Sequence, residues 1–493
     1  MLENRRDFLK TAAAGTAGIL GAMGFAAAPA EARAAKGKAK YDLIIAGAGC
    51  GGLVCAIRAA ELGLKPLVLE KMPMPAGNAV YAAGFLLGIN TSFQKAKGVP
   101  PDTVEAFYKD MMTVSQQQAN PALTRKVAED CTKLLEWLHS SCGVNFSTGA
   151  KLVWPQLTRS HLVVGETKPG GAQLIKNLMA RAKALGVECR YSTKVVSLLA
   201  DPKTGGCAGV RVKSKAGIEE IRSRAGVVIA TGGFSANQAL VTAFCGSAGA
   251  KMPIRGSRII AGENITLTAP FMPKVVHVDQ YHCGPIHGPT GANPLNIVNN
   301  GICVNKAGKR FTDEGQTYVQ MSRDVAAMTP DNWAYMVCDQ TAHDLPILKN
   351  DWDSYARLGA PVYTGSTIEE AAQKAGIDPK ALAETVEDFN DAVEDKAAAT
   401  KLTPPNTLET VRPVVKAPFY IVPFQGGMTA TFGGPMINTD GQVLDTENQP
   451  IPGLFAAGNA CGGIFYDNYV GGAQLTAAGV FGLAVAEYVK AHA

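Results

Sequence analysis

The stretch that decides the fold is YDLIIAGAGCGGLVCAIRAAELGLKPLVLEK, residues 41–71. The apolar run Leu43–Ala46 is typical of a buried parallel strand, and Pro66–Leu69 is typical of a second one. The apolar residues between these runs recur at helical spacing, and they are Leu53, Ala56, Ile57 and Ala60. The stretch therefore predicts a strand–helix–strand unit.

A glycine motif of the form G-x-G-x-x-G joins the first strand to the helix, at Gly47, Gly49 and Gly52. Glycines allow the tight turn and let backbone N–H groups, including that of Gly51, approach a pyrophosphate at the helix N-terminus. Glu70 ends the second strand, and the Glu70 carboxylate can accept hydrogen bonds from ribose hydroxyls. Lys71 follows directly. Such a motif inside a complete unit, with the acid about 20 residues on, indicates a dinucleotide site for either NAD or FAD.

Two later segments favour FAD. They are GVVIATGGFSAN, residues 226–237, and PIPGLFAAGNA, residues 450–460, and each reads as a strand that ends in glycines. With them the sequence resembles the FAD-binding superfamily that contains fumarate reductase, the succinate dehydrogenase flavoprotein, urocanate reductase and 3-ketosteroid dehydrogenases. The resemblance covers nearly everything from Tyr41 to the C-terminus, and FAD is the cofactor it implies.

The resemblance also implies the residues that contact FAD. The two later segments would close the dinucleotide site and hold the ribityl chain, and MPMPAGNAVYAAGF, residues 72–85, is similar to the loop over the isoalloxazine ring. The final helix, which we expect to begin around Gly472 and Ala473, would aim its positive end at the pyrimidine edge of the flavin. These segments contribute Gly77, Asn78, Ala83, Gly84, Ala230, Thr231, Gly232, Gly458, Asn459, Ala473, Gln474 and Leu475.

The fold class we expect is α/β, a Rossmann-like FAD-binding domain with an inserted α+β clamp (cap) domain. The FAD-binding domain would comprise residues 41–276 and 431–493, and the clamp domain residues 277–430. Within the clamp, Asp378 and Pro379 predict the start of a helix whose apolar face is core. The segment EDKAAATK, residues 394–401, reads as a solvated loop.

The N-terminus carries a targeting signal. Arg5 and Arg6 precede a mildly apolar, glycine-interrupted run, and A-x-A-like sites follow near residue 30, which is typical of a twin-arginine signal peptide over residues 1–32. The alternative is a membrane anchor, but the run is weakly apolar for a spanning helix. We therefore expect export to the periplasm and no stable membrane span after processing.

Composition excludes several classes of function. The net charge is +5 over 493 residues with dispersed basic side chains, so nucleic acid is not an expected partner. The 11 cysteines show neither CxxC spacing nor the C-x-x-C-H haem motif, so we expect no metal site and no covalent haem. Electrons would come from or go to a separate cytochrome or quinone, and the other partner would be a small-molecule substrate.

Two tyrosines stand where fumarate reductases keep arginines. Tyr318 lies four residues after Glu314 of the family's R-F-x-x-E segment, and Tyr469 precedes the glycine pair of YVGG. A substrate-binding histidine before FGG is also replaced, by Ala430. In these places the sequence is similar to 3-ketosteroid dehydrogenases. That resemblance implies that Tyr318 exchanges a proton with one substrate carbon, while Tyr469 donates to the substrate carbonyl.

The same resemblance implies further residues of the substrate site, and other residues remain candidates for the same roles. The backbone N–H of Ala473, next to Gly472, would help to bind the carbonyl, and His282 would be the histidine that survives from the substrate clamp. The rivals are Tyr466 for the role of Tyr469, His287 as a second histidine, and Arg323 as an arginine that could bind a carboxylate from a different turn.

The function that these observations favour is an exported FAD-dependent oxidoreductase. It would transfer hydride between flavin N5 and a C=C or CH–CH bond conjugated with a carbonyl, in a ketosteroid- or enone-like substrate. One alternative is a respiratory reductase of fumarate or urocanate type, and another is an electron-transfer subunit without a small substrate of its own. A cavity over the flavin that contains both tyrosines would favour the enzyme over the electron-transfer subunit.

Overall fold

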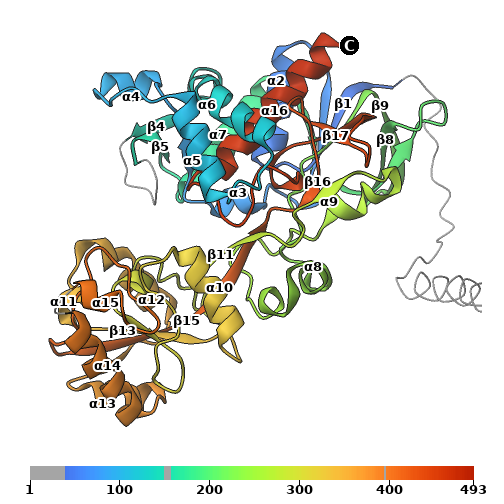
Figure 1. Ribbon diagram of the computed structural model, residues 1–493. Coiled ribbons are helices and arrows are strands. Elements are labelled where there is room, and N and C mark those ends of the chain that lie inside the picture. Colours follow the sequence, from blue (N-terminus) through green and yellow to red (C-terminus); the bar gives the residue numbers. More distant parts are fainter. Residues whose placement is uncertain (1–38, 149–156, 394–395) are drawn as a thin grey trace, which may run out of the picture.

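The computed structural model describes residues 39–148, 157–393 and 396–493. The expected signal peptide, residues 1–32, lies outside the described residues. The described chain forms two lobes (Figure 1). The larger lobe combines the first part of the chain with its C-terminal part, and the smaller lobe is built from residues between them. This confirms the α/β fold class, and residues 277–430 remain our proposed clamp domain.

The larger lobe is organised around a sheet with the strand order β17-β18-β9-β1-β2-β6, and β7 and β8 extend it from β9. The contacts from β18 through β9, β1 and β2 to β6 are parallel, as the strand–helix–strand prediction requires. The strands are β1 (Tyr41–Ala46), β2 (Pro66–Leu69), β6 (Glu188–Arg190), β7 (Lys194–Ala200), β8 (Cys207–Ser214), β9 (Gly217–Ile229), β17 (Gln442–Leu444) and β18 (Pro450–Ala456).

Two helices cross at the centre of this lobe. Gly51 of α2 (Cys50–Glu61) and Gly482 of α16 (Ala473–Ala491) lie at the contact, where a Cβ on Gly482 would come 2.6 Å from the Gly51 carbonyl oxygen. α16 is buried on nearly every side, which explains its almost wholly apolar sequence. The Cys50 Sγ lies 3.9 Å from the Leu475 carbonyl oxygen, so the N-termini of α2 and α16 lie in the same region, and α16 starts where the sequence predicts.

The remaining elements of the larger lobe surround this core. A small antiparallel sheet consists of β3 (Phe85–Leu87), β5 (Ser160–Val164) and β4 (Asn145–Thr148). The helices are α3 (Asn78–Tyr81), α4 (Ser92–Ala96), α5 (Val104–Val114), α6 (Pro121–Cys142), α7 (Gly170–Ala184) and α9 (Glu263–Thr266). A further helix, α8 (Gln238–Ala250), lies apart from this core and packs on α10 (Tyr318–Met328) (Figure 1).

The clamp lobe contains an antiparallel sheet of order β11-β15-β13-β12, with β14 also paired to β15. Its strands are β11 (Tyr281–Ile286), β12 (Ile302–Val304), β13 (Ala334–Cys338), β14 (Tyr363–Gly365) and β15 (Phe419–Thr431). Its helices are α10 (Tyr318–Met328), α11 (Gln340–His343), α12 (Lys349–Leu358), α13 (Ile368–Ala375), α14 (Pro379–Val393) and α15 (Lys396–Ala399).

Two sequence predictions in the clamp have different outcomes. The side chain of Asp378 accepts the N–H of Ala381 at 3.0 Å, so the predicted cap of α14 is confirmed. The predicted solvated loop at residues 394–401 is wrong for α15, which is helical and buries Ala399 completely. The alanine-rich composition supports a helix, and the contact of Ala399 with the clamp core explains its burial.

The chain passes between the lobes through two neighbouring strands. β11 carries it into the clamp and β15 carries it back, and the two strands pair along their whole overlap (Figure 1). α10 packs on both strands. Near the larger lobe, His282 of β11 lies opposite Ala430 of β15, beside an irregularity in the register. Side chains at this crossing can therefore contact residues of either lobe.

Candidate active site

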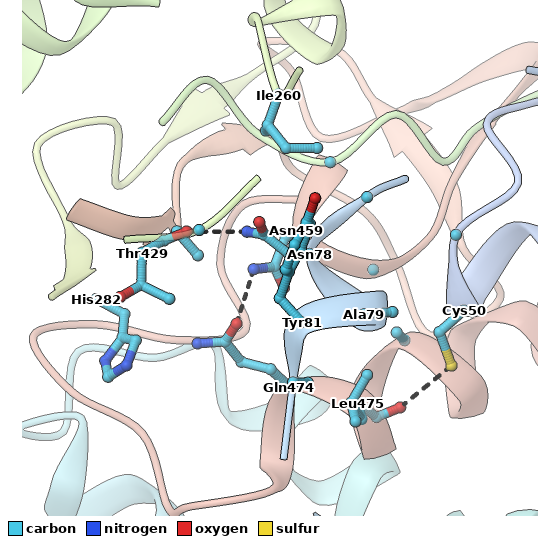
Figure 2. Close-up of a pocket in the computed structure, with 18 of the residues that line it drawn as sticks. Cys50, Asn78, Ala79, Tyr81, Ile260, His282, Thr429, Asn459, Gln474 and Leu475 are labelled. Atoms are coloured by element: carbon cyan, nitrogen blue, oxygen red, sulfur yellow. Dashed lines mark hydrogen bonds between the residues drawn. The ribbon is translucent and has the colours of Figure 1, made fainter. Parts of the chain in front are cut away.

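One cavity of about 740 Å³ runs from the glycine turn after β1 to the crossing between the lobes. Figure 2 shows its lining, with Cys50 and Leu475 on one side of the view and His282 on the other. All but two of the residues expected to contact FAD line the cavity. Those lining it are Gly47, Gly49, Gly51, Glu70, Lys71, Gly77, Asn78, Ala83, Gly84, Ala230, Thr231, Gly232, Gly458, Asn459, Gln474 and Leu475.

The turn after β1 has the shape that a pyrophosphate requires. Gly47 has φ +113°, and a Cβ there would come 2.4 Å from the Ala230 carbonyl oxygen. The first turn of α2 begins at Gly49 without a side-chain cap or an acidic residue within the described chain. Its N–H groups are therefore available to an anion, and the helix dipole favours one there.

Glu70 is buried beside this turn. Its carboxylate accepts the Ala48 N–H at 3.0 Å and the Met72 N–H at 2.9 Å. These bonds fix the carboxylate at the end of β2, and its remaining lone pairs can accept ribose hydroxyls. Lys71 lines the cavity as well, but its ammonium is paired with Glu263 at 2.6 Å.

Gly52 does not line the cavity. A Cβ at this position would come 2.1 Å from the Gly47 carbonyl oxygen and 3.1 Å from the Ile45 side chain. The third glycine of the motif therefore lets α2 pack closely on β1 and is not placed to contact a cofactor, which matches the packing role of this position in dinucleotide motifs.

The loop after β2 is tied to both lobes by Asn78. Its side-chain N–H donates to the Thr429 carbonyl at 2.9 Å (Figure 2), and its carbonyl oxygen accepts the Ser257 N–H at 2.7 Å. Gly84, with φ +95°, lies against the backbone of Gly170, where a Cβ would come 2.4 Å from the Gly170 carbonyl carbon. These contacts close the side of the cavity formed by residues 77–84.

The third glycine segment and α16 meet at the middle of the cavity. The Asn459 amide donates to the side-chain oxygen of Gln474 at 2.8 Å (Figure 2), while the Gln474 amide nitrogen is buried without a partner among the described residues. An unpaired buried donor at a helix N-terminus suits an acceptor group of a bound ligand. Together with the glycine turn and Glu70, it gives the cavity the donors and backbone clearance that FAD needs.

Gly472 and Ala473 have different surroundings. Gly472 lines the cavity, but Ala473 is fully buried in the core and is the second expected contact residue that does not line it. The Ala473 N–H donates to the Val470 carbonyl at 2.9 Å. The turn that starts α16 thus uses the N–H that the sequence analysis assigns to a substrate carbonyl.

Tyr318 and Tyr469 meet in the cavity from different lobes. Tyr318 is the first residue of α10, capped by Thr317, and Tyr469 lies in the loop before α16. Their phenol groups are close enough for each to shift the pKa of the other. Upstream of Tyr318, Arg310 pairs with the buried Glu314 at 2.6 Å, so the R-F-x-x-E segment anchors the start of α10.

The electrostatics keep both phenols protonated at neutral pH. Burial raises the pKa of Tyr318 and raises the pKa of Tyr469 well above its usual value. The positive charge of Arg255 opposes this shift for both phenols. Their mutual interaction lowers the pKa of Tyr318 and raises that of Tyr469, so Tyr318 is the more acidic member of the pair.

His282 packs against both tyrosines. Its ring centroid is 5.8 Å from that of Tyr318 and 4.8 Å from that of Tyr469, both edge to face. Burial, together with the charges of Arg255 and Arg323, lowers the pKa of His282 well below its usual value, so the ring is neutral. Its Nδ1 is buried and has no partner among the described residues.

The three rival residues lie elsewhere. Tyr466 packs its ring at 5.2 Å from that of His277 and does not line the cavity. The His287 Nδ1 bonds to the Thr290 hydroxyl at 2.9 Å, away from the cavity. Arg323 is paired with Asp467 and donates to the Tyr281 carbonyl at 2.7 Å, which makes it a link between α10 and the loop that carries Tyr469.

A charged residue of the cavity, Arg255, was not predicted from the sequence. Arg255 lines the cavity near the two tyrosines, and it donates to the Thr429 hydroxyl at 3.0 Å. Asn293, with its amide oriented to satisfy both of its neighbours, accepts from the Arg255 guanidinium at 3.1 Å. Arg255 belongs to no motif and is one of many dispersed basic residues, so the sequence offers no signal that could have found it.

The described residues contain neither a metal-binding cluster nor a helix that could span a membrane. No group of three or more histidine, cysteine, aspartate or glutamate side chains is placed to hold a metal ion in the part of the chain that the structure describes. Among those same residues, no helix has the length and apolar character needed to cross a membrane.

The fold and the cavity define an FAD-binding protein. The chain belongs to the FAD binding domain family, whose pattern matches residues 42–475. It is 30% identical over 447 residues to the NADH:fumarate oxidoreductase of Klebsiella pneumoniae (strain 342), a match that covers 90% of this chain and 47% of that protein. The chain thus spans about half the length of that relative.

Solved structures show the same architecture. The open conformation of a flavocytochrome c3 fumarate reductase matches with a TM-score of 0.78 and 27% identity, covering 92% of this chain and 78% of the other. A 3-ketosteroid-delta4-(5alpha)-dehydrogenase from Rhodococcus jostii RHA1 matches with a TM-score of 0.75 and 24% identity, covering 93% and 99%. The second likeness is one of fold. The expected superfamily and its cofactor, FAD, are confirmed.

Proposed function

We propose that this protein transfers hydride between flavin N5 and a C=C or CH–CH bond conjugated with a carbonyl, in a ketosteroid- or enone-like substrate. The observation that carries the proposal is the pair formed by Tyr318 and Tyr469 in the cavity that also contains the expected FAD residues. A cavity built from both lobes around such a pair suits an enzyme with a small substrate better than a pure electron-transfer subunit.

The two phenols have complementary roles in this proposal. Tyr469 has a pKa raised well above its usual value, so it stays protonated and donates a hydrogen bond to the substrate carbonyl as negative charge develops on that oxygen. Tyr318 is the more acidic of the two and exchanges the proton with the carbon next to the carbonyl. The bound FAD supplies the hydride exchange at N5.

His282 completes the pocket without titrating. Its neutral ring packs edge to face on both tyrosines and keeps their planes in place. The free Nδ1 can accept or donate one further hydrogen bond, depending on the tautomer. Ala430, opposite His282, leaves room where fumarate enzymes keep a second histidine, which favours a substrate bulkier than a small dicarboxylate.

Export and the electron partner belong to the same proposal. The twin-arginine stretch at Arg5 and Arg6 supports transport of the folded, FAD-loaded protein to the periplasm. A separate cytochrome or quinone would exchange electrons with the flavin, and the likeness to a flavocytochrome supports a cytochrome in this role.

The test is reoxidation of the reduced flavin. The purified holoprotein is photoreduced without oxygen, and an enone steroid, a small enone or fumarate is added while the visible flavin absorbance is followed. The proposal expects rapid reoxidation by an enone and slow or no reoxidation by fumarate. Reoxidation by fumarate alone would contradict the carbonyl assignment, and no reoxidation by any acceptor would favour the electron-transfer subunit.

A further inference from the structure

Three cationic side chains line the cavity, and one of them differs from the other two in its partners. Lys71 and Lys194 pair with the same carboxylate, that of Glu263, at 2.6 Å and 3.7 Å. Arg255 forms no ion pair with any carboxylate of the described residues; its partners are the neutral side chains of Thr429 and Asn293. Its Nε is buried and has no partner within the same described chain. A half-buried guanidinium without an anion is costly, and an anionic ligand would offset that cost.

The surroundings of Arg255 are shaped around its side chain. A Cβ on Gly284 of β11 would come 2.8 Å from the Arg255 guanidinium carbon, so a side chain there would displace the guanidinium. A Cβ on Gly427 of β15 would come 3.1 Å from the Arg255 Cβ. Two adjacent strands of the crossing therefore leave room for this arginine, while Thr429 and Asn293 fix the plane of its guanidinium.

Arg255 acts on the tyrosine site and not on the dinucleotide end. Its charge lowers the pKa of His282 and opposes the rise in the pKa of both phenols, so it lies in the same electrostatic environment as these three side chains. Ile286 and Leu295 line the cavity as apolar wall, which suits a carbon chain between a reacting bond and a charged end.

We propose that Arg255 and Asn293 form a carboxylate-binding subsite, so that the substrate carries a carboxylate in addition to the carbonyl-conjugated bond. The planar fork of arginine binds a carboxylate through two parallel hydrogen bonds, and the Asn293 amide orients it. This inference rests on the proposed function for the reacting bond, but the carboxylate itself can be tested by binding alone.

The binding experiment uses the oxidised holoprotein and a matched pair of probes. 4-Oxopentanoate and its methyl ester share a ketone and a carbon chain and differ in the carboxylate. Calorimetric titration of the wild type is expected to show that the acid binds about 10- to 100-fold more tightly than the ester. Equal affinities, tighter binding of the ester, or no binding of the acid would overturn the proposal.

Variants assign the preference to Arg255. Arg255→Gln is expected to remove the preference for the acid, and Arg255→Lys to restore part of it. Gly284→Ala keeps the charge but fills the space beside the guanidinium, so it should also reduce the preference. Arg258→Gln is the matched control, because Arg258 is exposed, lies three residues away and does not line the cavity. A preference that persists in Arg255→Gln would overturn the assignment.

Turnover separates this inference from the proposed function. Photoreduced holoprotein is mixed with 4-oxo-2-pentenoate or its methyl ester, which contain the same C=C and ketone. Arg255→Gln is expected to slow reoxidation by the acid about 10-fold or more and to leave reoxidation by the ester within about 2-fold. Equal loss with both probes would contradict a carboxylate subsite. If the acid binds selectively but neither probe reoxidises the flavin, the proposed reaction fails and the subsite stands.

Discussion

The two ends of the cavity are built in different ways. The dinucleotide end is made mostly of backbone: a glycine turn, a helix N-terminus and a carboxylate held by two N–H groups. The end at the lobe crossing is made of side chains, namely Tyr318, Tyr469, His282 and Arg255. A site made of backbone tolerates almost no added side-chain atoms, but it depends little on the residue types elsewhere in the chain. A site made of side chains can change its chemistry with one substitution. The following predictions test this contrast, from the largest expected effect to the smallest.

Gly47→Ala should abolish FAD binding. The new Cβ would lie 2.4 Å from the Ala230 carbonyl oxygen, and the residue would be strained at φ +113°. We expect the variant to purify without flavin, measured as the ratio of flavin to protein absorbance. Gly63→Ala is the control, since φ there is also positive, at +79°, but nothing lies within 4 Å. It should cost roughly 1 to 2 kcal/mol of stability and keep its flavin.

Tyr318→Phe and Tyr469→Phe should retain flavin and lose chemistry. Removing a proton-transfer group is expected to slow enone-dependent reoxidation by about 10²- to 10⁴-fold, and removing a carbonyl donor by about 10²- to 10³-fold. Stopped-flow reoxidation gives the rates and the visible spectrum gives the FAD content. Tyr466→Phe is the control, because Tyr466 does not line the cavity. Loss of flavin in either cavity variant would contradict the division of the cavity into two ends.

The pH dependence of reoxidation should be flat through neutrality. Both phenols have raised pKa values, so they lose the proton only above the usual tyrosine range. They therefore remain protonated and able to donate a hydrogen bond through neutral pH. His282 has a pKa lowered well below its usual value, so it stays neutral and adds no step near pH 6 to 7. A rate profile measured between about pH 6 and 9 checks this. A histidine-like inflection would show that His282 titrates during the reaction.

Asp467→Asn should have the smallest effect. It removes the ion pair with Arg323 that links α10 to the loop of Tyr469, while asparagine still tolerates the φ of 57° at this position. We expect the reoxidation rate to fall about 3- to 10-fold with unchanged FAD content. The free energy of unfolding should fall by about 1 kcal/mol. An unchanged rate would mean that the loop is held by its other contacts.

The contrast between the two ends also explains what the sequence could predict. The β1–α2–β2 unit, the cap of α14 and the start of α16 depend on residues that are close in sequence, and local patterns predicted them. Tyr318 and Tyr469 were found because they occupy positions of known motifs, and the structure brings them together.

Other features depend on tertiary contacts. Arg255 acquires its role from Thr429 and Asn293, which lie far along the chain, so no local pattern marks it. The Ala473 N–H is used by the Val470 carbonyl, which depends on the turn before α16. Arg323 meets Asp467 only because the clamp places α10 beside that loop.

The most direct test of the central claim, that Tyr469 at the carbonyl and Tyr318 at the neighbouring carbon act together in one reaction, is a double-mutant cycle on enone-dependent reoxidation. The rates of Tyr318→Phe, Tyr469→Phe and the double variant are measured with photoreduced holoprotein by stopped flow. If the two phenols act as a unit, the double variant should be about as slow as the slower single variant. Losses that multiply would show that the two tyrosines act independently and would contradict the account.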